Sequence, residues 1–361
     1  MGLRTPLYTS HLAAGAKMVD FAGWDMPLHY GSQIEEHHQV RRAAGMFDVS
    51  HMAVVDLAGK QVVEFLQRLL ANDVARLTAK GMALYSAMLN NSGGVLDDLL
   101  VYRMDDSYRL VLNAANSTSN LAWISQQAMS FAVTLKARED IAIIAVQGPC
   151  ARELCARAMS HSCSTPIPFL EPFHGLSKGD WFIARTGYTG EDGLEIMLPA
   201  VAAPGFWAAL LQNGVKPCGL GSRDTLRLEA GLNLYGADMD EYTSPLAASM
   251  GWTIAWEPEE REFIGRTALE KQRQSAKQPK QVGLVLRGRG VLRSGQSVMQ
   301  DGQRIGTITS GSFSPTLACS IALARIDHST GSKAQVDVRG KLLDVQLVRP
   351  RFVRHGEVIV D

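Results

Sequence analysis

The sequence lacks most of the motifs by which catalytic sites are recognised. It has no Gly-x-x-x-x-Gly-Lys-Ser/Thr phosphate loop and no His-Glu-x-x-His metal motif. Its five cysteines form no Cys-x-x-Cys pair, and His37 and His38 would point about 100° apart on a helix. Metal-dependent, covalent and nucleotide-dependent chemistry are therefore poorly supported.

Long apolar runs and an excess of one charge are also missing. No stretch approaches the roughly 18 apolar residues of a membrane span, and the N-terminal segment has no signal-peptide core. The 36 basic and 36 acidic residues balance, so nothing favours binding to nucleic acid or membranes, and we expect a cytoplasmic protein. Residues 271–361 nevertheless hold 15 basic and 6 acidic side chains, which would suit an anionic partner.

What the sequence contains is a mixed pattern of helices and strands. Its 361 residues exceed one ordinary core, so we expect two or three domains. Residues 1–30 read as irregular. The helices and strands predicted beyond them include helices at 32–44, 60–70, 116–129, 151–159, 201–212 and 225–229, and strands at 47–57, 83–90, 95–103, 108–113 and 141–147. We expect Ser32 to be the N-cap of the first of these helices and Gly45 to stop it, and the strands from 83 to 113 to form an antiparallel meander. After the polar segment 271–281, short β-rich runs alternate with glycine turns, which predicts a small barrel or sandwich.

Two adjacent carboxylates stand at the beginning of a strand. Gly93-Gly94 provides a turn, and Asp97 and Asp98 begin the apolar run that follows. Successive strand side chains face opposite ways, so the two carboxylates cannot face the same cavity. The pattern fits a functional carboxylate and turn-capping acids about equally well.

Further polar residues lie among glycines. Tyr188 lies in the glycine-rich loop 187–193, and Glu195 begins the strand after it. Arg223 and Arg227 are four residues apart and would share a helix face. A structural salt-bridge network is the preferred interpretation for Arg227, Asp224 and Glu229.

Several of these patches together resemble the aminomethyltransferase, or T-protein, family of the glycine cleavage system. The similarity runs from about Thr5 to His355. Ala247 departs from the family pattern, where many members have glutamate. The Lys-Gly-Cys-x-x-Gly-Gln-Glu signature of related folate-dependent iron–sulfur assembly proteins is absent. The matching segments are FDVSHM (47–52), 94–103, RTGYTGEDGLE (185–195), GSRDTLRLEAGLNLYG (221–236), GWTI (251–254) and TSGSFSP (309–315).

The resemblance implies an α+β fold with three domains around a central folate-binding channel. The first two domains interleave in sequence and contain mixed or antiparallel sheets, and the third is a small β-barrel-like domain. The implied ranges are 1–47 with 136–230, 48–135 with 231–275, and 282–361.

The resemblance also implies a reaction. An aminomethyl group on the lipoyl arm of H-protein would give its carbon to tetrahydrofolate, forming 5,10-methylenetetrahydrofolate and releasing ammonia. Tetrahydrofolate is then a co-substrate, and neither metal nor flavin is expected. Asp97 is carried over as the catalytic carboxylate near the reactive folate nitrogens. The folate contacts implied are Met52, Tyr85, Asp97, Asn113, Tyr188, Glu195, Arg223 and Trp252.

Two alternatives remain open at the level of sequence. One is a folate-dependent demethylase acting on a small methylated substrate. The other is a folate-binding protein without catalytic activity, against which the missing cysteine-containing signature argues.

Overall fold

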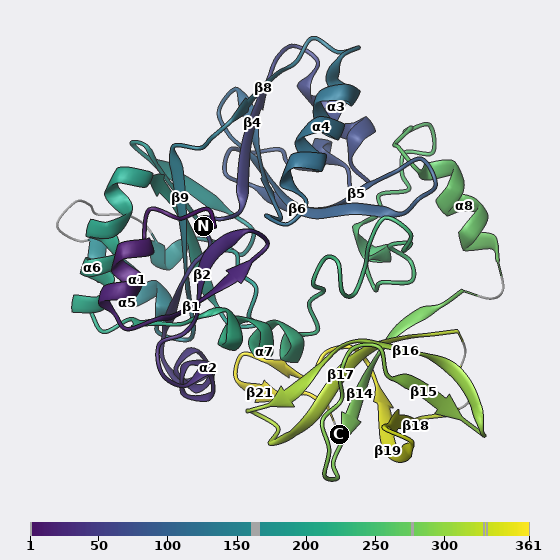
Figure 1. Ribbon diagram of the computed structural model, residues 1–361. Coiled ribbons are helices and arrows are strands. Elements are labelled where there is room, and N and C mark those ends of the chain that lie inside the picture. Colours follow the sequence, from purple (N-terminus) through teal and green to yellow (C-terminus); the bar gives the residue numbers. More distant parts are fainter. Residues whose placement is uncertain (1, 160–166, 276–277, 328, 330, 361) are drawn as a thin grey trace. The chain divides into compact units, whose positions relative to one another are not determined.

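Each of the two compact units of the protein is assembled from separate chain segments (Figure 1). The computed structural model describes residues 2–159, 167–275, 278–327, 329 and 331–360. The first unit comprises Met1–Val63, Val74–Leu84 and Leu99–Leu226, and the second comprises Glu64–Asp73, Tyr85–Asp98 and Arg227–Asp361. The interleaving of the N-terminal part agrees with the expected fold class. The three-domain boundaries given above stay a prediction.

The first unit is built on a six-stranded sheet with the order β10-β11-β12-β9-β3-β13. All seven residues of the predicted strand β9 are buried, because both faces of the sheet are covered. Ala142, Ile144 and Val146 enter one apolar cluster with the helices α5 and α6, whereas Ile143 and Ala145 enter another. The strands are β3 (Gly45–Asp48), β9 (Ile141–Gln147), β10 (Gly175–Lys178), β11 (Trp181–Ala184), β12 (Gly193–Pro199) and β13 (Lys216–Pro217).

The helices of the first unit follow the sequence signals closely. In α2, the Ser32 hydroxyl accepts a hydrogen bond from the Glu35 amide at 3.3 Å, which confirms the predicted N-cap. The helix ends at Arg42, before the glycine expected to stop it. The helices are α1 (Tyr8–Ala13), α2 (Gln33–Arg42), α4 (Ser117–Ala128), α5 (Ala151–Met159), α6 (Ala203–Gln212) and α7 (Leu220–Ala230, which continues into the second unit), with short 3₁₀ turns at Val74–Arg76, Ile167–Phe169 and Ala200–Ala202.

A five-stranded sheet carries the Asp97–Asp98 pair, with the order β5-β6-β7-β4-β8. The three neighbours β5, β6 and β7 are those predicted as a meander. The double glycine before β6 is required by the backbone: Gly93 has a φ of 80°, and a Cβ on Gly94 would lie 1.8 Å from the Glu241 carbonyl oxygen. The strands are β4 (Ala53–Ala58), β5 (Ala83–Leu89), β6 (Val95–Arg103), β7 (Ser107–Leu112) and β8 (Thr134–Ala137).

Three sequence predictions were wrong in detail. Residues 1–30 are not irregular, because they form α1 and the hairpin of β1 (Lys17–Phe21) and β2 (Trp24–His29). The strand predicted at 47–57 is broken by a turn between β3 and β4. Helix α7 begins at Leu220 rather than Thr225, because the Glu36 carboxylate accepts the Gly219 amide at 2.8 Å and so supports an earlier start.

The second unit contains the predicted barrel, a closed six-stranded ring with the order β14-β17-β16-β15-β18-β19. Leu284, Ile308 and Val336 are among the residues that fill it. The segment 271–281 is helical as far as Gln274, so it is not wholly a linker. No helix in the described ranges is long and apolar enough to cross a membrane. The remaining elements are α3 (Val62–Leu69, which begins in the first unit), Gly251–Thr253, α8 (Arg266–Gln274), β14 (Lys280–Leu286), β15 (Ser297–Gln300), β16 (Gln303–Ser314), β17 (Cys319–Ile326), β18 (Lys333–Val338), β19 (Lys341–Val348), β20 (Val353–Arg354) and β21 (Glu357–Val358).

Candidate functional site

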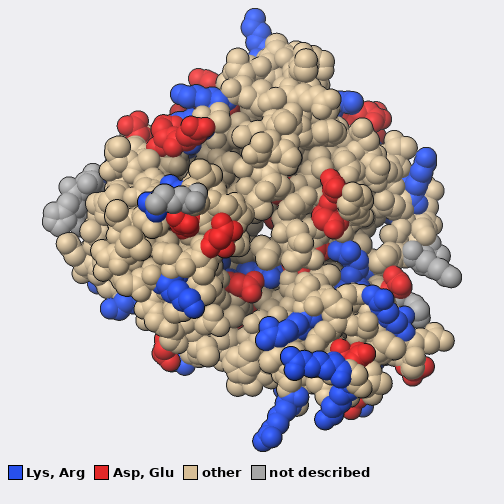
Figure 2. All heavy atoms as spheres, in the orientation of Figure 1, with Lys and Arg blue, Asp and Glu red and all other residues tan. Residues whose placement is uncertain are grey.

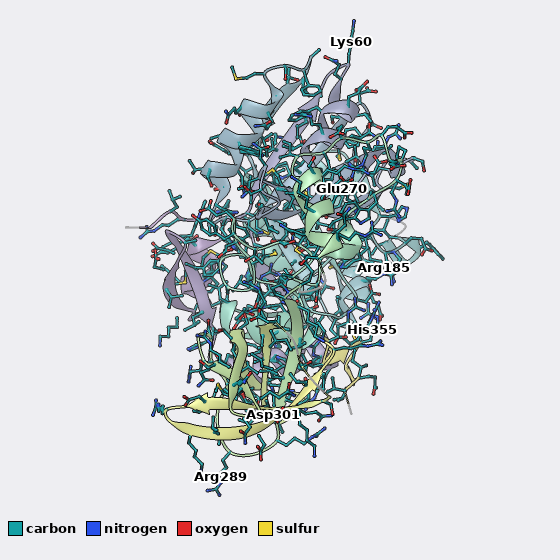
Figure 3. The ribbon with its side chains drawn as sticks, turned by 90° about the vertical axis from the view of Figure 1, so that its right-hand side faces the viewer. Lys60, Arg185, Glu270, Arg289, Asp301 and His355 are labelled. Carbon is teal, nitrogen blue, oxygen red and sulfur yellow. The ribbon has the colours of Figure 1, made fainter. Side chains whose placement is uncertain are left out.

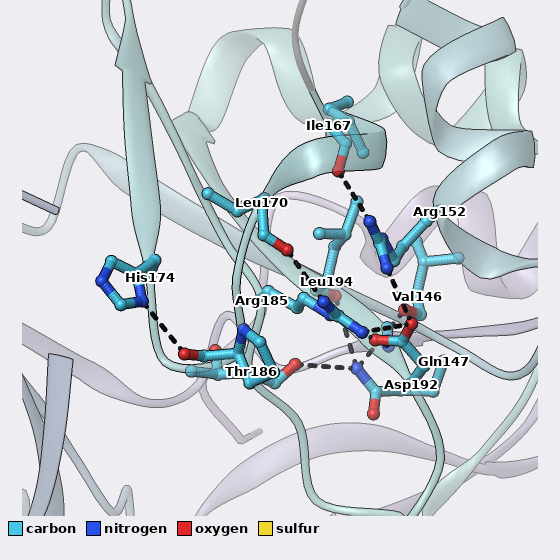
Figure 4. Close-up of polar contacts among 12 residues, drawn as sticks. Val146, Gln147, Arg152, Ile167, Leu170, His174, Arg185, Thr186, Asp192 and Leu194 are labelled. Carbon is cyan, nitrogen blue, oxygen red and sulfur yellow. Dashed lines mark hydrogen bonds and ion pairs between the residues drawn. The ribbon is translucent and has the colours of Figure 1, made fainter. Parts of the chain in front are cut away.

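The motif RTGYTGEDGLE forms a loop that is fixed by ion pairs (Figure 4). Arg185 binds the carboxylate of Asp192 through two nitrogens, at 2.7 and 2.9 Å, and Arg152 adds a third contact at 3.1 Å. Burial raises the pKa of Asp192, but the two arginines outweigh it and hold that pKa below its usual value. Gly187 lies so close to Gln147 that a Cβ would be 1.9 Å from its side-chain oxygen. Much of the motif is therefore structural, which leaves Tyr188 and Glu195 to be explained.

Glu195 ends a chain of buried hydroxyl groups. The Thr186 hydroxyl donates to Glu195 Oε2 at 2.6 Å, so its single proton is already used. The Tyr102 hydroxyl, 3.0 Å from the same Thr186 oxygen, must therefore donate to it. Burial, reinforced by the Glu195 carboxylate, raises the pKa of Tyr102 well above its usual value and keeps the phenol neutral. Glu195 is thus a buried acceptor that retains capacity for further N–H donors.

Arg223 lies on α7 with its guanidinium carbon 4.7 Å from the centre of the Tyr188 ring. Its Nη1 atom is closed off from solvent and has no hydrogen-bond partner among the described residues. Burial lowers the pKa of Arg223, and the Glu195 and Tyr188 side chains oppose that effect. A buried unpaired donor is costly, so it is a rare feature outside ligand sites. We call Tyr102, Thr186, Tyr188, Glu195 and Arg223 the Glu195 cluster.

Met52 and Asn113, two other predicted contacts, lie in the same unit. Met52 follows the turn after β3 and packs against the apolar cluster that includes Tyr102. Asn113 directly follows β7 and is partly exposed. Both side chains are partly exposed, and Met52 packs against the apolar cluster to which Tyr102 belongs.

The second unit holds a separate group of predicted residues. The Tyr85 hydroxyl donates to Asp98 Oδ2 at 2.7 Å. The Tyr85 ring stacks on Trp252, with the ring centres 5.7 Å apart and an interplanar angle of 23°. Trp252 is 63% exposed although it is a large aromatic residue. We call Tyr85, Asp98 and Trp252 the Asp98 cluster.

Asp97 has different surroundings from its neighbour. Buried and partly buried side chains alternate along the first part of β6, and Asp97 falls on the buried side with an exposure of 0%. Asp98, on the other side, is partly exposed. The sequence established that the two carboxylates point in opposite directions, but it did not show which one is accessible.

Arg227 and Glu229 lie in the structural network that the sequence indicated. Arg227 binds the carboxylate of Asp238 at 2.8 Å and the Ser310 hydroxyl at 3.0 Å. Glu229 accepts the Thr316 hydroxyl at 2.8 Å. These contacts join the end of α7 to β16 and the residues after it.

His51 is a residue that sequence reasoning passed over. Its motif, FDVSHM, was read as a strand, in which a lone histidine carries no special signal. The structure gives it a buried ring whose Nδ1 atom has no partner among the described residues. A turn signal at Asp48 and Ser50 was available in the sequence, because both residue types cap turns with their side chains.

Comparison with known proteins agrees with this architecture over its whole length. Residues 7–258 match the GCVT N-terminal domain, and residues 280–354 match the glycine cleavage T-protein C-terminal barrel domain. The chain is 58% identical to an aminomethyltransferase of Pseudomonas syringae pv. tomato, covering 100% of both chains. It is 57% identical to an aminomethyltransferase of Chromobacterium violaceum, covering 99% of both.

A solved structure shows the same fold. The crystal structure of glycine cleavage system aminomethyltransferase T from Bartonella henselae superimposes with a TM-score of 0.92 at 36% identity, covering 98% of this chain and 99% of that one. With this mixed α+β fold, this C-terminal barrel and these relatives, the chain is a transferase of the aminomethyltransferase class. The chain belongs to the glycine cleavage T-protein family.

Proposed function

We propose that this enzyme transfers the carbon of an aminomethyl group from the lipoyl arm of H-protein to tetrahydrofolate. The products are 5,10-methylenetetrahydrofolate, ammonia and dihydrolipoyl H-protein. The observation that supports the proposal is the Glu195 cluster, which holds a buried acceptor with spare capacity and a buried donor that has no partner in the described part of the chain. Such a pair is complementary to a ligand edge that presents both N–H groups and acceptor atoms, as a pterin does.

The roles of the cluster follow from its geometry. Glu195 accepts N–H bonds from the pterin, while Arg223 donates to an acceptor of the ligand. The Arg223 guanidinium lies over the Tyr188 ring, with its carbon 4.7 Å from the ring centre, and this contact limits the orientations of the guanidinium. Met52 and Asn113 belong to the same unit, where Met52 provides apolar surface and Asn113 can donate and accept.

The chemistry requires orientation and stabilisation of positive charge. The aminomethyl carbon carries nitrogen and sulfur, so it can ionise to an iminium-like cation that folate N5 attacks. Two protons leave the folate nitrogens, one for the departing amine and one for the lipoyl sulfur. A fixed carboxylate lowers the barrier by stabilising the cation. Binding both reactants in the correct orientation lowers it further, because they no longer have to meet by diffusion.

Asp97 and Asp98 are both candidates for that carboxylate. Packing favours Asp98, because it is partly exposed and is hydrogen-bonded to Tyr85, itself a predicted folate contact. Asp97 is fully buried on the opposite side of β6. An Asp98 carboxylate whose geometry is held by the Tyr85 hydroxyl needs little reorganisation as charge develops.

A pair of isosteric variants tests the assignment. Asp98→Asn removes charge at constant size, so turnover with aminomethyl-lipoyl H-protein and tetrahydrofolate should fall by about 10²–10³. Asp97→Asn, the matched control, should lower the midpoint of thermal unfolding, whereas its turnover should stay close to that of the parent enzyme. The reverse pattern would assign the charge to Asp97, and near-parental turnover in both variants would contradict a catalytic role for either.

The reaction itself is tested on the unmodified enzyme. It should turn over with aminomethyl-lipoyl H-protein and release ammonia, and it should be inactive with small methylated sulfonium compounds. Methyl transfer from the small compounds, without activity on H-protein, would favour the demethylase alternative.

A further inference from the structure

The turn between β3 and β4 is fixed from both sides. Asp48 Oδ1 accepts the Ser50 amide at 2.9 Å, and the Met52 amide bonds to the Val49 carbonyl at 3.1 Å. The Ser50 hydroxyl bonds to both backbone groups of Ile143 in β9, at 3.0 and 3.3 Å. The side chain that this turn presents, His51, is therefore held in one place.

The His51 imidazole is neutral. It is 8% exposed and meets the Phe21 ring edge to face, with the ring centres 5.6 Å apart. The pKa of His51 is lowered to about 4: burial is the main cause, the negative Asp48 opposes it, and the positive Arg223 adds to it. His51 directly precedes Met52, which packs against the apolar cluster that includes Tyr102, and it lies in the same unit as the Glu195 cluster. The influence of Arg223 on the ring agrees with this placement.

The position of the single ring proton follows from the partners. Nδ1 is closed off from solvent and has no partner among the described residues, whereas Nε2 is not closed off in this way. A proton on Nδ1 would leave a buried N–H without an acceptor, and orphaned N–H groups are rarer than under-used acceptors. The favoured tautomer therefore carries its proton on Nε2.

We propose that His51 contacts the substrate by donating a hydrogen bond from Nε2 to an acceptor atom of bound tetrahydrofolate. This rests on the proposed function and adds a second donor beside Arg223. A neutral donor held by a rigid turn can recognise an oxygen or imine nitrogen of the ligand without adding a buried charge.

Two substitutions distinguish the ring nitrogens. A glutamine amide can reach the position of Nε2, whereas an asparagine amide reaches that of Nδ1. In calorimetric titrations with tetrahydrofolate at pH 6 and pH 8, His51→Gln should bind within about threefold of the parent, and His51→Asn and His51→Leu about tenfold more weakly. The ratios should agree at both pH values because the ring does not titrate between them. His174→Gln is the control, since His174 faces the Pro172 carbonyl at 3.0 Å (Figure 4) and should be unaffected.

Binding by His51→Asn as tight as by His51→Gln, or parental binding by His51→Leu, would overturn the proposal. A measurement on the unmodified protein decides the matter if the variants do not fold. With ¹⁵N-labelled histidine, tetrahydrofolate should shift the Nε2 resonance of His51 and leave Nδ1 nearly unchanged, and an unmoved Nε2 resonance would overturn it. If the parent enzyme fails to bind tetrahydrofolate, the proposed function fails with it, which is a different result from a silent His51.

Discussion

Glu195 is a buried carboxylate that, among the residues the structure describes, accepts a side-chain hydrogen bond from one hydroxyl, that of Thr186. If the remaining capacity serves the pterin, Glu195→Ala should weaken tetrahydrofolate binding by tenfold or more, since a hydrogen bond to a charged group contributes about 1.5–3 kcal/mol. The measurement is a tetrahydrofolate titration, with thermal unfolding recorded in parallel. Glu153→Ala, a change at an exposed residue, is the control. Unchanged affinity in Glu195→Ala would make Glu195 a structural member of the hydroxyl chain.

At the residue scale, the sequence indicated candidate side chains but not where they point. Asp97 and Asp98 could be separated only by the burial of each side of β6 and by the hydrogen bond from Tyr85 on β5. His51 was missed for the same reason. A histidine becomes informative when its ring nitrogen has no partner, and that is a property of packing.

At the scale of elements, sequence signals worked where the cause was local. The N-cap of α2 and the buried strand β9 were predicted because a hydroxyl three residues before an amide, or a run of β-branched residues, acts within a few positions. The start of α7 was missed because its cap, Glu36, is remote in sequence. The β1–β2 hairpin was missed because its strands alternate only weakly and contain a proline.

The network at the end of α7 allows a prediction about stability. Asp238 binds the buried guanidinium of Arg227 and also accepts the Leu234 amide at 2.9 Å. Asp238→Ala leaves a buried charge without its partner, so it should lower the free energy of unfolding of the second unit by about 3–5 kcal/mol. Urea unfolding followed by circular dichroism measures the change.

The matched comparison is the exposed pair Glu153–Arg157. Glu153→Ala removes an ion pair of the same chemistry at the surface, where the loss should stay below about 1 kcal/mol. Equal effects of the two substitutions would contradict the claim that burial makes the Asp238 contact important.

At the scale of the whole molecule, charge is distributed unevenly along the chain. In Figure 2 blue side chains gather over the barrel, and in Figure 3 Arg289 extends away from it. No lysine or arginine after residue 280 forms an ion pair with another described residue, although most of them are exposed. Within the described residues, these basic side chains therefore do not serve mainly to neutralise acidic side chains of the same chain.

We expect these charges to steer an acidic H-protein or a polyglutamylated folate toward the enzyme. Such steering acts on association and fades as salt screens charges beyond about 10 Å at 0.1 M. The KM for H-protein should therefore rise with added salt, whereas kcat changes little. Steady-state kinetics across salt concentrations measure both constants.

Charge reversal provides the companion test. Reversing Lys277, Lys280, Arg351 and Arg354 together should raise KM at low salt and flatten its salt dependence; Lys277 lies outside the described residues, and the other three are exposed. A KM that does not depend on salt, with all four reversals silent, would leave these residues a role in solubility alone.

The interleaving of the chain has a consequence for biosynthesis. The first unit takes its segments from residues 1–63, 74–84 and 99–226, so a growing chain cannot complete it until well over half of the protein has been made. Until then its apolar strands cannot be fully covered by their partners in the folded unit, and this applies most of all to β9, which is wholly buried in the folded protein. The barrel strands, by contrast, are contiguous from Lys280 to Val348 and emerge last. The early part of the chain is therefore the one that depends on protection during translation, and no single continuous fragment contains either unit without a stretch of the other.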